Sequence, residues 1–252
     1  MNAFCALSNR VILVTGAGSG LGRGIATVLA GAGATVVVND IVAERVGETV
    51  QNLTEMGLRA ISGLADASEE TAIEDLFARI ESQGLNVDTL VFCATPAQRS
   101  VPLDEESWDY NERMLNIFVK SPLLLTQRAL PQMKARSFGR IVNITSEVFE
   151  TSEPGSSAYV AAKGAQIGWS RSAAKELAPF GITVNTVAPG FIPVERHRDL
   201  PQHVFDDYLA TVPAGRWGTP EEIGSAVRYL VSGEAAFVNG QTLIVNGGRT
   251  PH

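Results

Sequence analysis

The stretch VILVTGAGSGLGRGIATVLAGAG, residues 11–33, runs from an apolar segment through a glycine-rich turn into a helical pattern. It begins with the continuous β-branched and aliphatic run that is typical of a strand buried on both faces. The apolar residues after the turn recur at three- and four-residue spacing and share one face of a helix: Leu21, Ile25, Val28 and Leu29. The stretch therefore predicts a strand, a tight turn and a helix in immediate succession.

The spacing of the glycines in this turn indicates what the turn binds. It does not satisfy the pattern G-x-G-x-x-G, because Leu21 stands at the third glycine of that pattern. The pattern T-G-x-x-x-G-x-G is met instead, by Thr15, Gly16, Gly20 and Gly22. Backbone amides at a helix N-terminus attract phosphate, and glycine lets the backbone approach it closely. We expect a phosphate-binding loop, with a glycine-rich turn that binds no ligand as the alternative.

An acidic residue closes the second apolar run of the chain. Asp40 follows Gly16 by roughly the 20 residues at which a carboxylate hydrogen-bonds the adenosine ribose and repels a 2′-phosphate. Asp40 therefore favours NAD over NADP, and Ser19 agrees, because the loop itself contains no arginine. Arg23 lies just beyond the loop and keeps NADP open. The alternative for Asp40 is a turn or helix-cap aspartate, and Asp66 is placed either at the adenine edge or as a helix cap.

Short apolar runs alternate with helical patterns along the whole chain. Seven runs are candidate strands: residues 10–16, 34–40, 58–65, 87–94, 139–146, 182–189 and 241–248. Strand and helix alternate without a linker or an internal repeat. We therefore predict one α/β domain over residues 1–252, with a doubly wound, seven-stranded parallel sheet and helices on both faces. The long connection at about 190–212, with its prolines and charges, predicts a substrate lid.

Composition excludes several classes of partner. The 252 residues carry a net charge of −7 and no block of basic residues, which argues against nucleic acid and anionic membrane surfaces. The two cysteines form no disulfide framework, and nothing near them has metal-ligand spacing. No apolar run reaches the roughly 18 residues of a membrane helix. The first ten residues, MNAFCALSNR, lack the features of a signal peptide, so we expect a cytoplasmic protein without a metal site.

A tyrosine and a lysine share one face of the long helix predicted at 156–178. Tyr159 and Lys163 are four residues apart. A free tyrosine has a pKa near ~10, and an adjacent ammonium favours the phenolate and lowers that pKa. A phenol poised in this way can give a proton to an alkoxide or take one from an alcohol. The alternative is a half-buried aromatic ring beside a surface lysine.

Ser146 strengthens the catalytic interpretation of this pair. It closes the fifth predicted strand, and doubly wound sheets bind their ligands at the carboxyl ends of the strands. A serine hydroxyl there can polarise a carbonyl oxygen alongside Tyr159. We therefore expect Ser146, Tyr159 and Lys163 to act on the same substrate oxygen.

The chain carries a series of landmarks from one end to the other. They are TGAGSGLG, Asp40, Asp66, LNIF, GRIVNITS, YVAAK, VNTVAPG, PAGRWGTPEEI and VNGQTLIVNGG. With these landmarks the chain resembles the short-chain dehydrogenase/reductase family over nearly its full length. The resemblance implies a Rossmann fold, with Tyr159 as the acid–base and Ser146 positioning the substrate oxygen. It further implies that Lys163 also holds the nicotinamide ribose and that Asn116 helps to hold a water that relays protons to the lysine.

The resemblance also implies a cofactor-binding surface and an assembly. The implied cofactor residues are Gly16, Ser19, Gly20, Leu21, Gly22, Asp40, Ile41, Asp66, Ala67, Cys93, Ala94, Thr95, Tyr159, Lys163, Pro189, Gly190 and Ile192. The family commonly forms homotetramers, in which the Tyr159 helix and its neighbour at roughly 104–135 make subunit contacts. We carry both expectations over to this chain.

The chain departs from the family's pattern in two places. Where the family usually has Asn-Asn-Ala-Gly after the fourth strand, this chain has Phe92, Cys93, Ala94 and Thr95. We expect altered support and shape there without loss of a proton-transfer group, and an inert thiol at Cys93. Val194 stands where the family often has a threonine that meets the nicotinamide amide, although the backbone of Ile192 still offers that amide a partner.

Polar residues near the predicted site indicate the kind of substrate. Glu147 directly follows Ser146 and is expected to face the substrate, as are Glu195, Arg196 and His197 of the lid. These groups favour a hydroxylated or charged substrate, and a solvated lid is the alternative interpretation.

Together these features predict an NAD-dependent oxidoreductase that interconverts a secondary alcohol, such as a sugar, a polyol or a similar small hydroxy compound, and its ketone. The first alternative is a 3-oxoacyl-thioester reductase that uses NADPH, which Asp40 and Ser19 oppose. The second is a non-catalytic NAD-binding sensor or structural protein, which the altered segment at 92–95 motivates and the intact catalytic residues oppose.

Overall fold

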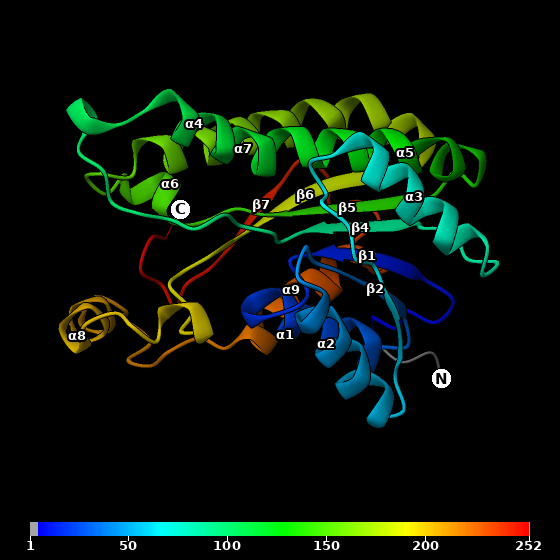
Figure 1. Ribbon diagram of the computed structural model, residues 1–252, viewed down its shortest axis with the longest axis horizontal. Helices are drawn as coiled ribbons and strands as arrows, with labels where there is room; N and C mark the ends of the chain where they lie inside the picture. Colours follow the sequence, from blue (N-terminus) through cyan, green and yellow to red (C-terminus); the bar gives the residue numbers. More distant parts are fainter. Residues whose placement is uncertain (1–4, 252) are drawn as a thin grey trace.

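Seven strands form one parallel sheet in the order β3-β2-β1-β4-β5-β6-β7 (Figure 1). We describe residues 5–251 of a computed structural model; part of the N-terminal stretch considered above, residues 1–4, lies outside this range. The strands are Val11–Thr15, Thr35–Asn39, Arg59–Ser62, Thr89–Phe92, Gly139–Ile144, Ile182–Pro189 and Thr242–Val245. The predicted doubly wound sheet is confirmed. The chain changes direction across the sheet between β1 and β4, which opens a crevice at the carboxyl ends of the strands.

Helices cover both faces of the sheet, and each face has its own hydrophobic core. Alternate side chains of a strand point to opposite faces, so Ile12 and Val14 pack with α1, α2 and α9 while Leu13 packs with α3, α5 and α7. The helices of the first face are α1 (Gly20–Gly31), α2 (Ala43–Glu55) and α9 (Pro220–Val231). Those of the second are α3 (Glu70–Glu81), α5 (Ser121–Ala135) and α7 (Ser157–Leu177). Continuous apolar strands are therefore required, as the sequence pattern indicates.

The two edge strands differ from this pattern. The expectation that every strand is buried on both faces is wrong for β3 and β7, whose residues are mostly half-exposed or exposed. Each edge strand has a neighbour on one side only and lies at the rim of the helix layers. In contrast, β4, β5 and β6, which carry the residues of interest at their carboxyl ends, are buried throughout.

A π-helical segment, Asn116–Lys120, joins α4 (Trp108–Leu115) to α5. Single π turns within α-helices widen the backbone locally and occur frequently at functional sites. This irregularity begins at Asn116, one of the residues predicted to be catalytic.

The connection after β6 forms a separate lobe. It contains a 3₁₀ turn at Glu195–His197 and the helix α8 (Gln202–Ala210), which stands apart from the sheet in Figure 1. A short helix, α6 (Val148–Thr151), follows β5 across from it. The remaining 3₁₀ turns are Leu103–Glu105 and Ala178–Phe180. Among residues 5–251, no helix has the length and apolar character needed to cross a membrane.

Candidate active site

The turn between β1 and α1 has the geometry of a phosphate cradle. A side chain at Gly22 would place its Cβ 2.1 Å from the carbonyl oxygen of Gly16, and one at Gly16 would lie 2.8 Å from the Cα of Ala94. Gly16 and Gly20 also have positive φ angles, which glycine adopts without strain. The amide end of α1 is thus held open toward the crevice, and a dinucleotide phosphate fits these residues.

Asp40 and Asp66 each accept a hydrogen bond from a residue two positions further on, as in the alternative role of a turn or helix-cap aspartate. Asp40 Oδ1 accepts a hydrogen bond from the amide of Val42 at 3.1 Å, and Asp66 Oδ1 accepts from the amide and the hydroxyl of Ser68. The second oxygen of Asp40 nevertheless faces the loop, since a Cβ at Gly18 would lie 2.7 Å from it. The Asp40 carboxylate therefore reaches the mouth of the cradle.

Most donors of the Arg23 guanidinium are engaged by its neighbours. It donates to the carbonyl of Gly18 at 2.6 Å and to the hydroxyl of Thr49 at 3.2 Å. It also pairs with Glu195 at 3.2 Å and lies 3.7 Å from Glu48. Arg23 thus ties the phosphate loop to α2 and to the lid, and it has few donors left for a phosphate.

Ser146, Tyr159 and Lys163 meet at the carboxyl end of β5. Tyr159 forms a hydrogen bond with Ser146, and its ring packs edge-on against Phe118 with the centroids 5.5 Å apart. The ammonium of Lys163 is buried, donates to the carbonyl of Ile144 at 2.6 Å and lies 3.6 Å from the centroid of the Phe118 ring. Phe118, which the sequence analysis did not single out, contacts both residues, and the Lys163 nitrogen lies 5.6 Å from the centroid of the Tyr159 ring.

Burial controls the pKa values in this cluster. Burial raises the pKa of Tyr159, and the hydrogen bond with Ser146 offsets part of that rise, as does the positive charge of Arg196. Burial lowers the pKa of Lys163 to about 7. The expectation that Lys163 lowers the pKa of Tyr159 is therefore wrong for this structure, because the lysine head is turned to the Ile144 carbonyl and to Gln166.

Gln98 is a polar neighbour of Tyr159 that the sequence analysis missed. Its side chain forms a hydrogen bond with Tyr159, and its amide nitrogen donates to Thr95 Oγ1 at 3.0 Å. Gln98 belongs to none of the motifs. The one signal near it in the sequence is the altered segment at 92–95, which ends three residues earlier.

The altered segment after β4 is supported from β1. Thr15 Oγ1 accepts hydrogen bonds from the amides of Cys93 and Ala94, both at 3.1 Å, while the Phe92 ring is buried in the second core. Thr95 is exposed and has no positive φ, so its backbone conformation does not require glycine. Burial raises the pKa of Cys93 to about 11, which keeps its thiol protonated and inert at neutral pH.

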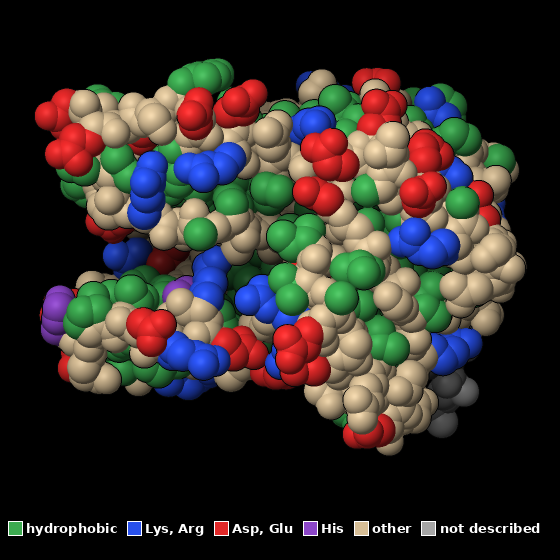
Figure 2. Space-filling view, in the orientation of Figure 1, with side chains coloured by type: hydrophobic (Ala, Val, Ile, Leu, Met, Phe, Trp, Pro, Cys, Tyr) green, Lys and Arg blue, Asp and Glu red, His purple; other side chains and the backbone are tan. Residues whose placement is uncertain are grey.

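The lid reaches across the crevice to the phosphate loop. The Val194 side chain and a Glu195 oxygen lie 3.3 and 3.4 Å from the position that a Cβ on Gly20 would occupy. In Figure 2 the molecule is hollowed on its left side, between the lobe that carries α8 and the one that carries α4 and α6, with Lys and Arg side chains around the mouth. The predicted lid thus roofs the cradle.

The sequence analysis expected Glu147 to face the substrate because it follows Ser146. This expectation is wrong. The Glu147 side chain is 2% exposed and accepts hydrogen bonds from Tyr208, Asn246 and Arg249. No motif or spacing indicates these partners, which lie 61 to 102 residues further along the chain.

The remaining predicted cofactor residues lie at or beyond the carboxyl ends of β1, β2, β3 and β6. Pro189 ends β6, Gly190 follows it, and Ile192, in the first residues of the lid, is buried. Ser19 precedes α1 and Leu21 lies in its first turn, Ala67 is buried behind Asp66, and Ile41 is exposed beside Asp40. Among residues 5–251, no three His, Cys, Asp or Glu side chains are grouped to hold a metal ion.

Comparison with known proteins identifies the family. Residues 16–250 match the family model described as enoyl-(acyl carrier protein) reductase. The chain is 33% identical to the 3-oxoacyl-[acyl-carrier-protein] reductase FabG of Thermotoga maritima, over 96% of this chain and 98% of that protein.

Two solved structures have the same fold. One is a gluconate 5-dehydrogenase from Burkholderia cenocepacia in complex with NADP and tartrate, with a TM-score of 0.90 and 32% identity over 97% of this chain and 96% of that chain. The other is a 3-oxoacyl-[acyl-carrier protein] reductase from Brucella melitensis with bound NAD, with a TM-score of 0.88 and 32% identity over 98% and 94%. The chain therefore belongs to the short-chain dehydrogenase/reductase family, whose members are oxidoreductases that act on CH–OH groups.

Proposed function

We propose that this protein interconverts a small secondary alcohol and its ketone with NAD, and that the alcohol is a hydroxylated compound bearing an anionic group. The observation that carries the proposal is the meeting of Tyr159, Ser146 and Lys163 beside a crevice that the phosphate cradle and Asp40 border.

NAD is supported by the charges at the mouth of the cradle. One Asp40 oxygen faces the loop at Gly18, where a carboxylate accepts hydrogen bonds from ribose hydroxyls and repels a 2′-phosphate. Arg23, which kept NADP open in the sequence, is held by the Gly18 carbonyl and by its acidic neighbours. Arg23 therefore has few donors left for a 2′-phosphate, while the Asp40 carboxylate faces the loop.

The side chains divide the proton chemistry among them. Bound nicotinamide supplies or accepts the hydride. Ser146 holds the substrate oxygen beside Tyr159, and the Tyr159 hydroxyl gives its proton to that oxygen during reduction or takes one during oxidation. Lys163, with a pKa lowered by burial to about 7, can exchange protons near neutral pH. We assign the proton-relaying water to Asn116, where the π-helical segment begins.

An anionic substrate is supported by Arg196 of the lid. Its charge acts on three groups of the site at once, because it opposes the protonated form of Tyr159, Cys93 and Lys163 alike. Basic side chains surround the mouth of the hollow in Figure 2. A substrate carboxylate would offset this positive charge next to the reacting oxygen. The gluconate 5-dehydrogenase of similar fold holds tartrate, a hydroxylated dicarboxylate.

A second candidate is the reduction of a 3-oxoacyl thioester with NADPH. The Thermotoga maritima relative is named as a 3-oxoacyl-[acyl-carrier-protein] reductase, a name that supports the reaction and states no cofactor. One local observation favours it: the Cβ of Arg45 lies 2.7 Å from the position of a Cβ on Gly18, so α2 also brings a basic residue to the adenosine end of the crevice. Arg45 and Asp40 therefore favour opposite cofactors.

A hydride assay separates the two candidates. The purified protein receives NAD or NADP with neutral polyols or small hydroxy acids, and in the reverse direction NADH or NADPH with a 3-oxoacyl thioester. We expect hydroxy acids with NAD to react fastest, and Tyr159→Phe to lower the rate about 10²–10⁴-fold. Arg196→Ala should weaken turnover of hydroxy acids more than that of polyols, while Arg198→Ala, also in the lid, is the matched control.

Three results would overturn the proposal. They are a clear preference for NADP, an unchanged rate in Tyr159→Phe, and binding of NAD without turnover of any alcohol or ketone, which would favour the sensor. We further expect a cytoplasmic homotetramer, as the resemblance implies, and light scattering of the purified protein tests the assembly.

A further inference from the structure

A buried carboxylate joins three parts of the molecule beside the carboxyl end of β5. Glu147 directly follows Ser146, and its side chain is 2% exposed. Its oxygens accept hydrogen bonds from Tyr208 Oη at 2.5 Å, Asn246 Nδ2 at 2.8 Å and Arg249 Nη1 at 3.0 Å. The donors come from the lid helix α8, the residue after β7 and the C-terminal segment, so one side chain links all three to the catalytic strand.

Arg249, in the C-terminal segment, contacts the lid at Thr211 and Tyr208. Its Nε donates to Thr211 Oγ1 at 2.7 Å, just beyond the end of α8, and its guanidinium lies 4.9 Å from the centroid of the Tyr208 ring. A second carboxylate, Glu153, lies 3.7 Å away but is 52% exposed, so Glu147 is the buried partner of this charge. A charge buried in this way needs its partner, because water cannot replace it.

The hydroxyl of Tyr208 connects Glu147 to the first residues of the lid. It donates to Glu147 and accepts from the amide of Phe191 at 2.7 Å. Burial and the bond to Glu147 raise the pKa of Tyr208, so the hydroxyl stays protonated and keeps its donor role. A Cβ at Gly190 would lie 2.4 Å from the same oxygen, so this crossing leaves room for glycine alone.

We propose that Glu147 is the positioning residue of the substrate lid: it holds α8 and residues 246–249 against the catalytic strand, so that residues 190–197 stand over the cofactor and substrate. The chain of contacts runs from Glu147 through Tyr208 to Phe191, and the same lid segment reaches the phosphate loop at Val194. A carboxylate suits this position because it accepts from all three donors at once, whereas the NH₂ of a glutamine would face them as a fourth donor.

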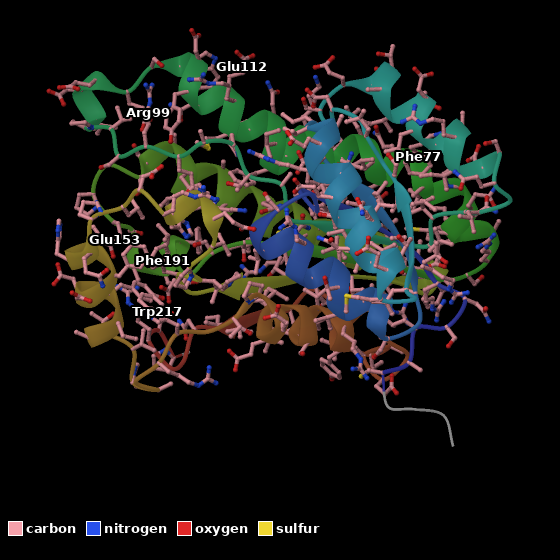
Figure 3. All side chains as sticks on the ribbon, turned by 60° about the horizontal axis from the view of Figure 1, so that its bottom comes forward. Phe77, Arg99, Glu112, Glu153, Phe191 and Trp217 are labelled. Atoms are coloured by element: carbon pink, nitrogen blue, oxygen red, sulfur yellow. The ribbon has the colours of Figure 1, made fainter. Side chains whose placement is uncertain are left out.

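A tryptophan that packs against the lid can report its position. The ring of Trp217 stacks on that of Tyr208, with the centroids 5.6 Å apart and the planes 9° from parallel, and it packs against Phe191. Figure 3 shows Phe191, Trp217 and Glu153 at the same end of the molecule. In a chain whose other two tryptophans, Trp108 and Trp169, are phenylalanine, the emission and acrylamide quenching of Trp217 report the position of the lid.

The experiment compares Glu147→Gln with Glu153→Gln, which removes the exposed carboxylate near Arg249. The proposal predicts that Glu147→Gln raises the KM for cofactor and alcohol about tenfold or more, because a loosened lid leaves only part of the molecules competent to bind. The kcat should change much less, since saturating ligands restore the closed lid. Trp217 should become more accessible to acrylamide, and Glu153→Gln should resemble the parent in both measurements.

A second variant guards against loss of folding. Tyr208→Phe keeps the ion pair of Glu147 and Arg249 but removes the hydroxyl that reaches Phe191, so it should reproduce the rise in KM and in quenching. The proposal is wrong if a folded Glu147→Gln or Tyr208→Phe keeps the parental KM and quenching, or if Glu153→Gln changes them equally.

The inference rests on the proposed function only in its kinetic arm. If the parent protein turns over no alcohol, the proposed function fails while the quenching of Trp217 still decides the role of Glu147. If the alcohol reaction is found and Glu147→Gln behaves as the parent, the positioning role fails and the proposed function stands.

Discussion

Lys163 shows how strongly a single position depends on its surroundings. Its ammonium lies between the Ile144 carbonyl and the face of the Phe118 ring, and the side chain is buried. Burial penalises the charged form and lowers its pKa from 10.5 to about 7. A lysine that is fully charged in the unfolded chain at neutral pH is thus only partly charged in the folded protein, and its burial costs stability there.

Stability should therefore rise with pH because of Lys163. Between about pH 7 and about 10.5, the unfolded chain binds more protons at this lysine than the folded protein does. The free energy of unfolding therefore increases as the pH rises through this range. Lys163→Met removes this contribution. Urea unfolding across that range measures the free energy of unfolding of the parent and of Lys163→Met. The parent's value minus the variant's should grow toward high pH, whereas a constant difference would contradict the lowered pKa. Lys175→Met, an exposed position on the same helix, is the control.

At the scale of the element, the backbone of the turn into α1 has to meet two requirements. The loop must bring Gly22 to within van der Waals contact of the Gly16 carbonyl, and it must leave the amides of α1 open to a phosphate. A Cβ on Gly22 would stand 2.1 Å from that carbonyl oxygen, much closer than real Cβ contacts. The helix can begin where it does only because this side chain is absent.

Two glycines of α1 should therefore respond oppositely to alanine. Gly22→Ala is expected to cost about 1–3 kcal/mol by overpacking and to weaken NAD binding, because the loop must move. Gly31→Ala, at the other end of the same helix and with nothing within 4 Å of the new Cβ, should stabilise the protein by about 0.4–1 kcal/mol. Chemical denaturation with titration of NAD measures both effects. Equal responses at the two positions would show that the close approach to Gly16 does not limit the loop.

At the scale of the whole molecule, the sheet places the two halves of the site on either side of its switch point. The cradle and Asp40 follow β1 and β2, while Ser146 and the lid follow β5 and β6. β1 and β4 are neighbours in the sheet, and Thr15 joins the ends of these strands through the amides of Cys93 and Ala94. A dinucleotide bound across this line would contact both halves and hold them together.

Cofactor binding should therefore stabilise the entire fold. At 100 times its dissociation constant, NAD should add about 2.7 kcal/mol, and each kcal/mol raises Tm by about 2–4 °C in a chain of this size. Thermal unfolding with NAD and with NADP at equal concentration measures the two shifts. We expect the larger one with NAD, because of Asp40. An equal or larger shift with NADP would indicate that Arg45 outweighs Asp40.

Much of this arrangement was accessible from the sequence. The seven apolar runs became the seven strands, and Ile25 and Leu29, two of the residues predicted to share one helix face, are buried in α1. Such patterns can be read locally, because the alternation of a strand and the periodicity of a helix follow from backbone geometry. The nearness of Ser146 to Tyr159 was also predictable, since the ends of parallel strands meet at one edge of a sheet.

The sequence by itself determined the doubly wound fold, the phosphate cradle and the types of residue at the catalytic edge, because each depends on neighbours a few residues apart or on a regular topology. Only the tertiary structure decided the direction of the Lys163 head, the engagement of Arg23 and the burial of Glu147 among Tyr208, Asn246 and Arg249. These depend on side chains distant in the chain, and the pKa values and charges that they set depend on burial. A carboxylate next to the serine predicted to be catalytic was expected to face the substrate, but packing buries it among residues of α8, the end of β7 and the C-terminal segment.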